Sequence, residues 1–318
     1  MPRILVVAPN WIGDALMAQP LLARLREKRP GAQLDVLAPE WVAPVARRMP
    51  EVGEVIAVPF RHGRLQLRER WRLGRSLRAR GYAQAIVLPN TWKSALVPFF
   101  AGIALRSGYV GESRYGLLNQ LYKRQGAPMN LHYARLSEPP GTEPAAPLPR
   151  PRLQVDLQEI ESVRRKFQIP ARYAVLCPGA EYGPAKRWPY FAGLSEKMPL
   201  EKVILGSASD TEAAQGIGGT NLVGRTSLDE AIALLAGAAC VVSNDSGLMH
   251  VAAALGRPQV ALFGSSSPEH TPPQSAAARV LWLRLECSPC FARECPLGHF
   301  RCMRDISVEQ VLAEVDRL

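Results

Sequence analysis

The 318-residue chain is predicted to be an α/β protein with two domains, each built on a parallel, doubly wound sheet. Short apolar, β-rich runs alternate with helical stretches along most of its length, as expected of strands joined by crossover helices. Residues 138–151 hold six prolines in fourteen positions and can form neither a helix nor a central strand. We therefore expect a semi-rigid linker at 138–151, between domains at 1–150 and 151–318 that hinge across a cleft.

In the first domain, residues 3–8 (RILVVA) predict the opening strand, which breaks into a polar PNWIGD turn. A single helix should follow, with an apolar face made by Leu16, Leu21, Leu22 and Leu25, and it should end at Pro30 and Gly31. Further strands are expected at 34–38, 55–58 and 85–88, and a helix at 65–80. No G-x-G-x-x-G follows the first strand, which argues against a nicotinamide or flavin site there.

The second domain repeats the alternation. Strands are expected at 173–177, 202–205, 240–242 and 258–263, and helices at 157–167, 188–197, 227–236 and from Ser246. An amphipathic helix at 307–318 should close the chain.

The stretch 240–264 (CVVSNDSGLMHVAAALGRPQVALFG) reads as strand, polar turn, helix and strand, the crossover unit of a parallel sheet. Ligands bind at the carboxyl ends of such strands, where Asn244, Asp245, Ser246 and Gly247 open a helix. Free backbone N–H groups and the helix dipole there favour a phosphate. Asp245 is itself an anion, so it suits either sugar hydroxyls or a capping role on the helix.

A second loop follows the strand at 173–177, with the sequence PGAEYGPAKRWP. Its glycines and prolines, with Gly179 and Gly183 among them, predict a tight turn, and Lys186 lies just before a helix expected at Trp188. A lysine at the carboxyl end of a strand can hold a diphosphate. Together with the turn at Asp245, on the same edge of the same sheet, this loop specifies a nucleotide-diphosphate pocket.

The net charge of +11 is confined to one half of the chain. Residues 1–150 hold 22 Lys and Arg against 10 Asp and Glu, whereas residues 151–318 hold 17 against 18. Residues 61–80 alone hold eight arginines and one acid, interleaved with Leu and Trp. This segment is a solvated helix face, a clamp for a phosphorylated substrate, or a contact for anionic lipid headgroups.

No apolar run reaches the roughly 20 residues that span a bilayer, and residues 94–105 (SALVPFFAGIAL) are expected in the core or in a semi-exposed apolar patch. The N-terminus lacks a signal-peptide pattern, so a cytoplasmic protein is expected. Its six cysteines are then free thiols or metal ligands. Cys287, Cys290, Cys295 and Cys302 lie close in sequence, and the alternatives for them are a zinc site and a loop of reduced thiols.

Three motifs resemble the ADP-heptose:lipopolysaccharide heptosyltransferase family, whose members have two facing Rossmann-like domains of the GT-B type. They are NWIGDALMAQPLL (10–22), PGAEYGPAKRWP (178–189) and SNDSGLMHVAAALGRPQVALFG (243–264), so the likeness extends nearly from end to end. The second motif is most similar to that of the members that attach the second inner-core heptose. The resemblance implies an inverting transfer of L-glycero-D-manno-heptose from ADP-heptose to the first heptose of a Kdo-lipid A core.

The resemblance also implies roles for individual residues. Asp14 would be the catalytic base. The donor would be bound by Lys186, Asp245, Ser246, Gly247, His250 and Gly179, with Ser207 and Thr226 beside the adenosine, and the acceptor by Asn10, Arg61, Arg64 and Arg68. No cofactor would be required, although a divalent cation could stimulate the reaction.

The basic N-terminal domain would then meet an anionic, lipid-linked acceptor, which places the protein at the cytoplasmic face of the inner membrane as a peripheral protein. The alternatives are addition of the first heptose, another nucleotide sugar on the same fold, and, more remotely, nucleic-acid binding. No nucleic-acid-binding signature accompanies the basic charge, so nucleic acid is not expected as a partner.

Overall fold

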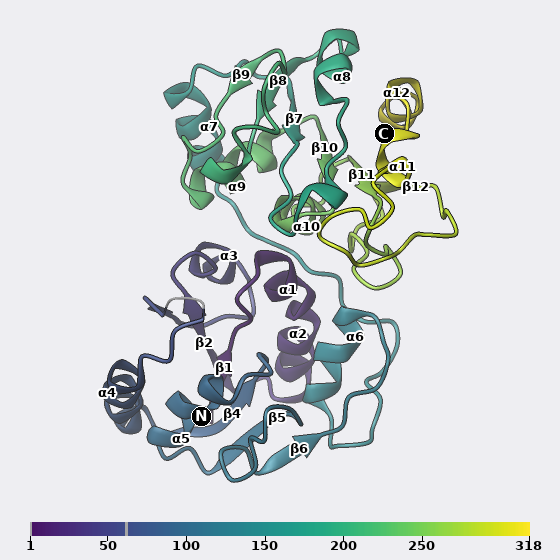
Figure 1. The fold of residues 1–318 in the computed structure, drawn as a ribbon. Helices are drawn as coiled ribbons and strands as arrows, with labels where there is room; N and C mark the ends of the chain where they lie inside the picture. The colour runs from purple at the N-terminus through teal and green to yellow at the C-terminus, as the bar shows by residue number, and fades with distance from the viewer. Residues whose placement is uncertain (1, 61–62) are drawn as a thin grey trace. The chain divides into compact units, whose positions relative to one another are not determined.

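The computed structural model describes residues 2–60 and 63–318, and it divides into two compact units, residues 1–151 and 152–318. Each unit has a six-stranded sheet whose strands, among the described residues, all pair in parallel, with helices packed against it (Figure 1). The predicted fold class, α/β with two doubly wound parallel sheets, is confirmed.

Unit 1 has the sheet order β3-β2-β1-β4-β5-β6. Its strands are β1 (Arg3–Val7), β2 (Gln33–Pro39), β3 (Val55–Val58), β4 (Tyr82–Val87), β5 (Leu105–Tyr109) and β6 (Gln120–Tyr122), and its helices are α1 (Ile12–Met17), α2 (Gln19–Lys28), α3 (Ala43–Arg47), α4 (Leu67–Leu77), α5 (Leu96–Phe100) and α6 (Met129–Ala134). Leu5 and Val7 of β1 pack in one cluster with Leu77 of α4 and Val97 of α5. Alternate residues of a strand point to opposite faces, so Ile4 and Val6, also buried, serve the other face.

Unit 2 has the order β12-β11-β10-β7-β8-β9, the same winding as unit 1. Its strands are β7 (Tyr173–Cys177), β8 (Glu201–Ile204), β9 (Thr220–Asn221), β10 (Cys240–Asn244), β11 (Gln259–Phe263) and β12 (Ala278–Trp282), and its helices are α7 (Leu157–Lys166), α8 (Phe191–Lys197), α9 (Leu228–Gly237), α10 (Gly247–Ala254), α11 (Arg301–Arg304) and α12 (Val308–Val315). Val242 of β10 packs with Leu194 of α8 and Val311 of α12, so the closing helix covers the sheet as expected.

Two helix predictions are wrong at their boundaries. The single helix expected after β1 is two helices, because Ala18 is both the C-cap of α1 and the N-cap of α2, and Pro20 in the first turn of α2 cannot donate to the preceding turn. The helix expected from Trp188 begins at Phe191 instead. Trp188 lies before it as a core residue, 2% exposed, whose indole Nε1 donates to the Ile306 carbonyl at 2.9 Å.

The proline-rich segment contains no helix or strand from 138 to 151. Arg24 of α2 donates to the carbonyls of Ala145 and Pro147, both at 2.6 Å, and Lys28 forms an ion pair with Glu138. The segment is therefore held along α2 by side chains of unit 1.

The apolar stretch 94–105 folds into the end of a 3-10 helix η2 (Trp92–Ala95), α5 and the start of β5. Ala95, Leu96 and Val97 are buried, whereas Phe99 is 43% exposed, so the stretch is part core and part surface. Among the described residues, none of the helices has the length and apolar content needed to cross a bilayer.

Candidate functional site

Both sheets have one point where the strand order reverses, between β1 and β4 in unit 1 and between β7 and β10 in unit 2. Connections leaving the two central strands there run in opposite directions, which opens a crevice at their carboxyl ends where ligands of such folds bind. The candidate residues Asn10 and Asp14 follow β1, Lys186 follows β7, and Asp245 follows β10. The structure thus places the principal candidates at these two points.

In unit 2 the loops after β7 and β10 are joined by an ion pair. Nζ of Lys186 lies 2.5 Å from Oδ2 of Asp245, and the side chains are 17% and 5% exposed. The same Asp245 oxygen accepts from the Ser266 hydroxyl at 2.6 Å. The Lys186 ammonium also lies 5.1 Å from the centre of the Tyr182 ring, so it is held between an aromatic face and a carboxylate.

Asn244, the last residue of β10, fixes the loop after β7 at both of its ends. Its Nδ2 donates to the Pro178 carbonyl at 2.7 Å, and its Oδ1 accepts from the Trp188 amide at 3.1 Å. The side chain is fully buried, so neither bond competes with water. This clamp sets where Lys186 lies relative to Asp245.

The helix that follows β10 offers unpaired donors to a ligand. Its N-cap is Ser246, which makes no side-chain capping bond, and the Ser246 Oγ has no partner among the described residues although it is shielded from solvent. The capping role considered for Asp245 is therefore wrong, since that carboxylate bonds Lys186 and Ser266 instead. Gly247 is the first residue of α10, where the helix dipole favours an anion.

His250 lies one turn into α10 and is 6% exposed. Burial lowers its pKa to about 4, an effect that the nearby Lys186 reinforces and Asp245 opposes. The imidazole is therefore neutral at pH 7 and can donate or accept a hydrogen bond without adding charge.

The remaining donor candidates lie on loops at the carboxyl ends of β7, β8 and β9. A Cβ on Gly179 would lie 2.2 Å from Cγ of Asp210, so the loop after β7 can approach this carboxylate only with glycine there. Asp210 accepts from both the amide and the hydroxyl of Ser207, at 2.9 and 2.7 Å. Gly224 donates to Gly206 at 3.0 Å, which brings the loop that carries the half-buried Thr226 beside Ser207.

In unit 1, Asp14 is the third residue of α1 and is half-buried. The N-cap of α1 is Trp11, so Asp14 does not cap this helix, although a carboxylate in the first turn still interacts favourably with the dipole. The pKa of the buried Tyr133 in α6 is raised, first by burial and then by the charge of Asp14. The carbonyl of Asn10 accepts from the Trp41 indole at 2.8 Å, which ties the turn before α1 to the loop after β2.

The arginine-rich segment divides into structural and exposed residues. Arg70 is 7% exposed, donates to the Leu65 carbonyl at 2.7 Å and lies over the Phe60 ring at 4.1 Å. Arg64 and Arg68 are exposed, and Arg61 lies outside the described residues. The exposed side chains of Leu67 and Trp71 share α4 with Arg68, so the helix presents charge and apolar surface together.

Ser266 and Arg114 are among the buried polar residues that sequence reasoning missed. Ser266 belongs to a run of three serines that begins one residue after β11, and such a run at the end of a buried strand was the available signal. Arg114, 1% exposed, donates to the carbonyls of Pro89 and Tyr109 and so shapes the loop after β4 at the unit 1 crevice. Nothing in the local sequence separates it from the many surface arginines.

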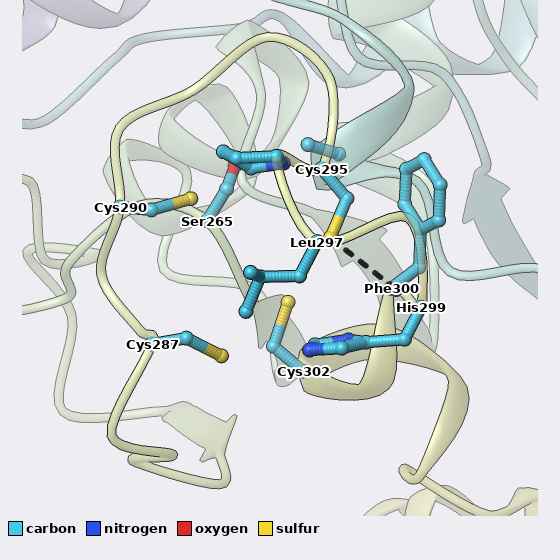
Figure 2. Close-up of a pocket in the computed structure, with 10 residues that line it drawn as sticks. Ser265, Cys287, Cys290, Cys295, Leu297, His299, Phe300 and Cys302 are labelled. Carbon is cyan, nitrogen blue, oxygen red and sulfur yellow. Dashed lines mark hydrogen bonds between the residues drawn. The ribbon is translucent and has the colours of Figure 1, made fainter.

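The four clustered cysteines line one small cavity together with His299, Ser265 and Ala185 (Figure 2). All six cysteines are free thiols, and backbone N–H groups, first that of Phe300, lower the pKa of Cys295. Among the described residues, no group of three or more His, Cys, Asp or Glu side chains could hold a metal ion in its present arrangement.

Comparison with known proteins gives consistent matches. The sequence profile described as glycosyltransferase family 9 (heptosyltransferase) matches residues 70–301. Lipopolysaccharide heptosyltransferase 2 of Escherichia coli K12 is 42% identical over 341 residues, 99% of this chain and 98% of that protein. Lipooligosaccharide heptosyltransferase 2 of Haemophilus ducreyi is 39% identical over 349 residues, 99% of each chain. The solved structure of E. coli ADP-heptose LPS heptosyltransferase II superposes with a TM-score of 0.88 at 41% identity, over 99% of this chain and 98% of that one.

Proposed function

Because the chain belongs to glycosyltransferase family 9, the heptosyltransferases, we propose that it moves L-glycero-D-manno-heptose from ADP-heptose to the first heptose of a Kdo-lipid A inner core. It is an enzyme of the GT-B type, with two Rossmann-like units. Its full-length likeness to heptosyltransferases 2 supports the second heptose as the one transferred, with inversion at the anomeric carbon.

The observation that carries the donor assignment is the Lys186–Asp245 pair at the strand-order reversal of unit 2. A diphosphate at this point would accept from the Lys186 ammonium and from the first amides of α10, beginning with Gly247. Asp245 then serves to orient the ammonium and to accept from a sugar hydroxyl. The neutral imidazole of His250 adds a hydrogen bond without a charge.

The adenosine is assigned to the loops after β8 and β9. Ser207 and Thr226 lie on these joined loops, and Gly179 lets the loop after β7 pass close to them. This arrangement extends the donor site along the carboxyl edge of the sheet from β10 through β7 to β8 and β9.

We assign the catalytic base to Asp14. In a single inverting displacement, the acceptor hydroxyl oxygen attacks the anomeric carbon while Asp14 takes the hydroxyl proton. The new C–O bond forms as the bond to the ADP oxygen breaks, and ADP leaves with that electron pair. Lys186 offsets the charge that develops on the diphosphate.

This displacement uses a base and a cation that the chain itself supplies, so no cofactor is needed. A divalent cation would add to Lys186 in neutralising the diphosphate, and we expect it to stimulate turnover. Assays with magnesium and with excess EDTA test this, since a complete loss of turnover in EDTA would show that the metal is required.

The acceptor is assigned to unit 1, which carries the whole basic excess of the chain. Arg68 of α4 and Arg64 just before it, with Arg61 and the turn at Asn10, are proposed to meet its phosphorylated saccharide. Exposed Leu67 and Trp71 on the same helix suit a peripheral association with the anionic cytoplasmic face of the inner membrane. Binding to vesicles with and without anionic lipid tests the location.

The function is tested by turnover of a panel of nucleotide sugars on Kdo-lipid acceptors with and without one heptose. We expect transfer only from ADP-heptose and only to the acceptor that already carries one heptose. Transfer to the heptose-free acceptor would identify an enzyme for the first heptose, and a preference for another donor would refute the assignment.

A further inference from the structure

Four thiols of unit 2 face one cavity of about 60 Å³ that the proposed reaction does not use. Cys287, Cys290 and Cys295 belong to the segment 283–300 between β12 and α11, which has no helix or strand, and Cys302 belongs to α11. In Figure 2 the sulfur atoms of all four point inward from different sides of the cavity, and the His299 ring lies beside Cys302.

Packing does not explain these thiols. The other two cysteines, Cys177 and Cys240, are buried in central strands, where a thiol behaves as a small apolar side chain. In the loop, Cys290 is exposed, and Cys287 and Cys295 are only half-buried. Three of the four thiols therefore contribute little to an apolar core.

The turn after Cys295 is shaped to receive a thiolate. The Phe300 amide donates to the Cys295 sulfur at 3.4 Å, and Gly298, at a φ of +69°, closes the turn by donating to the Cys295 carbonyl at 3.0 Å. Backbone N–H groups directed at sulfur favour its anionic form, which is the form that binds a metal.

We propose that Cys287, Cys290, Cys295 and Cys302 bind one Zn²⁺ or Fe²⁺ ion in a tetrahedral, all-thiolate site. Both ions accept four thiolates in this geometry, and binding releases the thiol protons to solvent. The side chains must rotate to meet at one ion, because they do not do so in the present arrangement. Rotation about χ1 of the three loop thiols disturbs little packing, and the buried Cys302 of α11 can keep its place in the core.

The ion would stabilise the cysteine-bearing segment 283–300, which packs against the loop that carries Lys186. That this affects donor binding rests on the proposed function. The Arg293 carbonyl accepts from the Ala185 amide at 3.0 Å, and the Phe291 carbonyl accepts from the Tyr182 hydroxyl at 2.6 Å. The two acceptors, Phe291 and Arg293, lie between Cys290 and Cys295 in the sequence. The two donors, Tyr182 and Ala185, lie in the loop that carries Lys186. A Cβ at Gly183 would lie 2.5 Å from the Arg293 carbonyl oxygen, so the two loops pack closely.

Elemental analysis of the full chain, purified without chelator from metal-replete medium, tests the site directly. We expect about one ion per chain, and the element found distinguishes zinc from iron. Replacement by Co²⁺ should give thiolate-to-cobalt charge-transfer bands and tetrahedral d–d bands. Less than about a tenth of an ion per chain, or a cobalt spectrum without thiolate bands, would overturn the proposal.

Variants identify the ligands. Cys290→Ser and Cys295→Ser should each lower the metal content at least about fivefold, while Cys240→Ala, which removes a thiol far along the sheet, should retain it. An equal loss in Cys240→Ala and in the loop variants would refute these ligands. If the loop variants do not fold, the metal content and cobalt spectrum of the wild-type chain still decide.

The effect on the donor site is measured separately. Chelated, folded protein should bind ADP more weakly than the metal-bound protein, and metal should restore the affinity. Unchanged ADP affinity would refute the inference that the bound ion stabilises the loop that carries Lys186. Metal content does not depend on transfer, so a failure of the proposed function would leave this result intact.

Discussion

Replacing Lys186 with alanine tests the donor site most directly, because it leaves a buried carboxylate without its cation. The Asp245 side chain is 5% exposed and, among the described residues, would keep only its bond from Ser266 at 2.6 Å. Removing one partner of a buried ion pair costs about 3–5 kcal/mol of stability. Because Lys186 is partly exposed and Ser266 still donates to Asp245, we expect a loss of stability at the lower end of this range, about 3 kcal/mol.

The same substitution should weaken ADP binding. One charge-assisted contact to a desolvated diphosphate contributes roughly 1.5–3 kcal/mol, which corresponds to a Kd raised about 10- to 150-fold. Calorimetric titration with ADP measures this loss, and urea denaturation measures the stability.

Two further variants separate the effects. Lys186→Ala combined with Asp245→Asn removes the unpaired charge, so it should recover most of the stability but none of the ADP affinity. Lys197→Ala breaks the surface pair between Lys197 and Glu309, whose side chains are 53% and 68% exposed, and should leave both the stability and ADP binding nearly unchanged.

Two results would refute the reasoning. An ADP affinity equal to that of the wild type in Lys186→Ala would remove the lysine from the diphosphate site. A double variant as unstable as Lys186→Ala would show that the unpaired Asp245 charge is not the source of the lost stability.

Three other predictions follow from the site. Asp14→Asn should keep the melting temperature and ADP affinity while turnover falls about 10²- to 10⁴-fold, and a folded variant that keeps more than about a tenth of wild-type kcat would rule out Asp14 as the base. Reversing the charges of Arg64 and Arg68 to glutamate should raise the acceptor KM and leave ADP affinity unchanged; a shift in both quantities, or in neither, contradicts the acceptor assignment. The pKa of His250 is about 4 in the folded protein and about 6.5 in the unfolded chain. As the pH falls below about 6.5, the unfolded state therefore takes up a proton at this residue before the folded state does. The free energy of unfolding should then decrease as the pH drops from about 6.5 towards 4. Between pH 7 and pH 5, urea denaturation of the ADP-free protein should show wild type losing roughly 2 kcal/mol more than His250→Gln, and equal losses would show that this imidazole is not buried in its neutral form.

The sequence by itself determined the winding of the two sheets and the residues at their central strands. Strands buried on both faces must be continuous apolar runs, so β1, β7 and β11 were predicted within one residue of their observed ends. Helix starts with a local signal were also readable: Ser227 and Ser307 each cap the helix expected there, with Glu or Gln three residues later. These features depend on neighbours in the chain.

Edge strands and irregular helix starts were decided by tertiary contacts. The sequence did not predict β5, β6, β9 or β12, because strands at or near an edge need little apolar content and take their form from the strand that they pair with. Trp188 lies outside α8 because Asn244, 56 residues away, accepts from its amide and the core takes its ring.

The site shows the same division. The sequence identified Lys186 and Asp245 as residues at one sheet edge, but only the adjacency of β7 and β10 brings their charges to 2.5 Å across 59 residues. That same contact removed the capping role from Asp245, while burial in the folded domain set the neutral state of the nearby His250. Local sequence encodes which groups lie at strand ends, whereas their pairing and pKa depend on burial and on partners that only the folded sheet supplies.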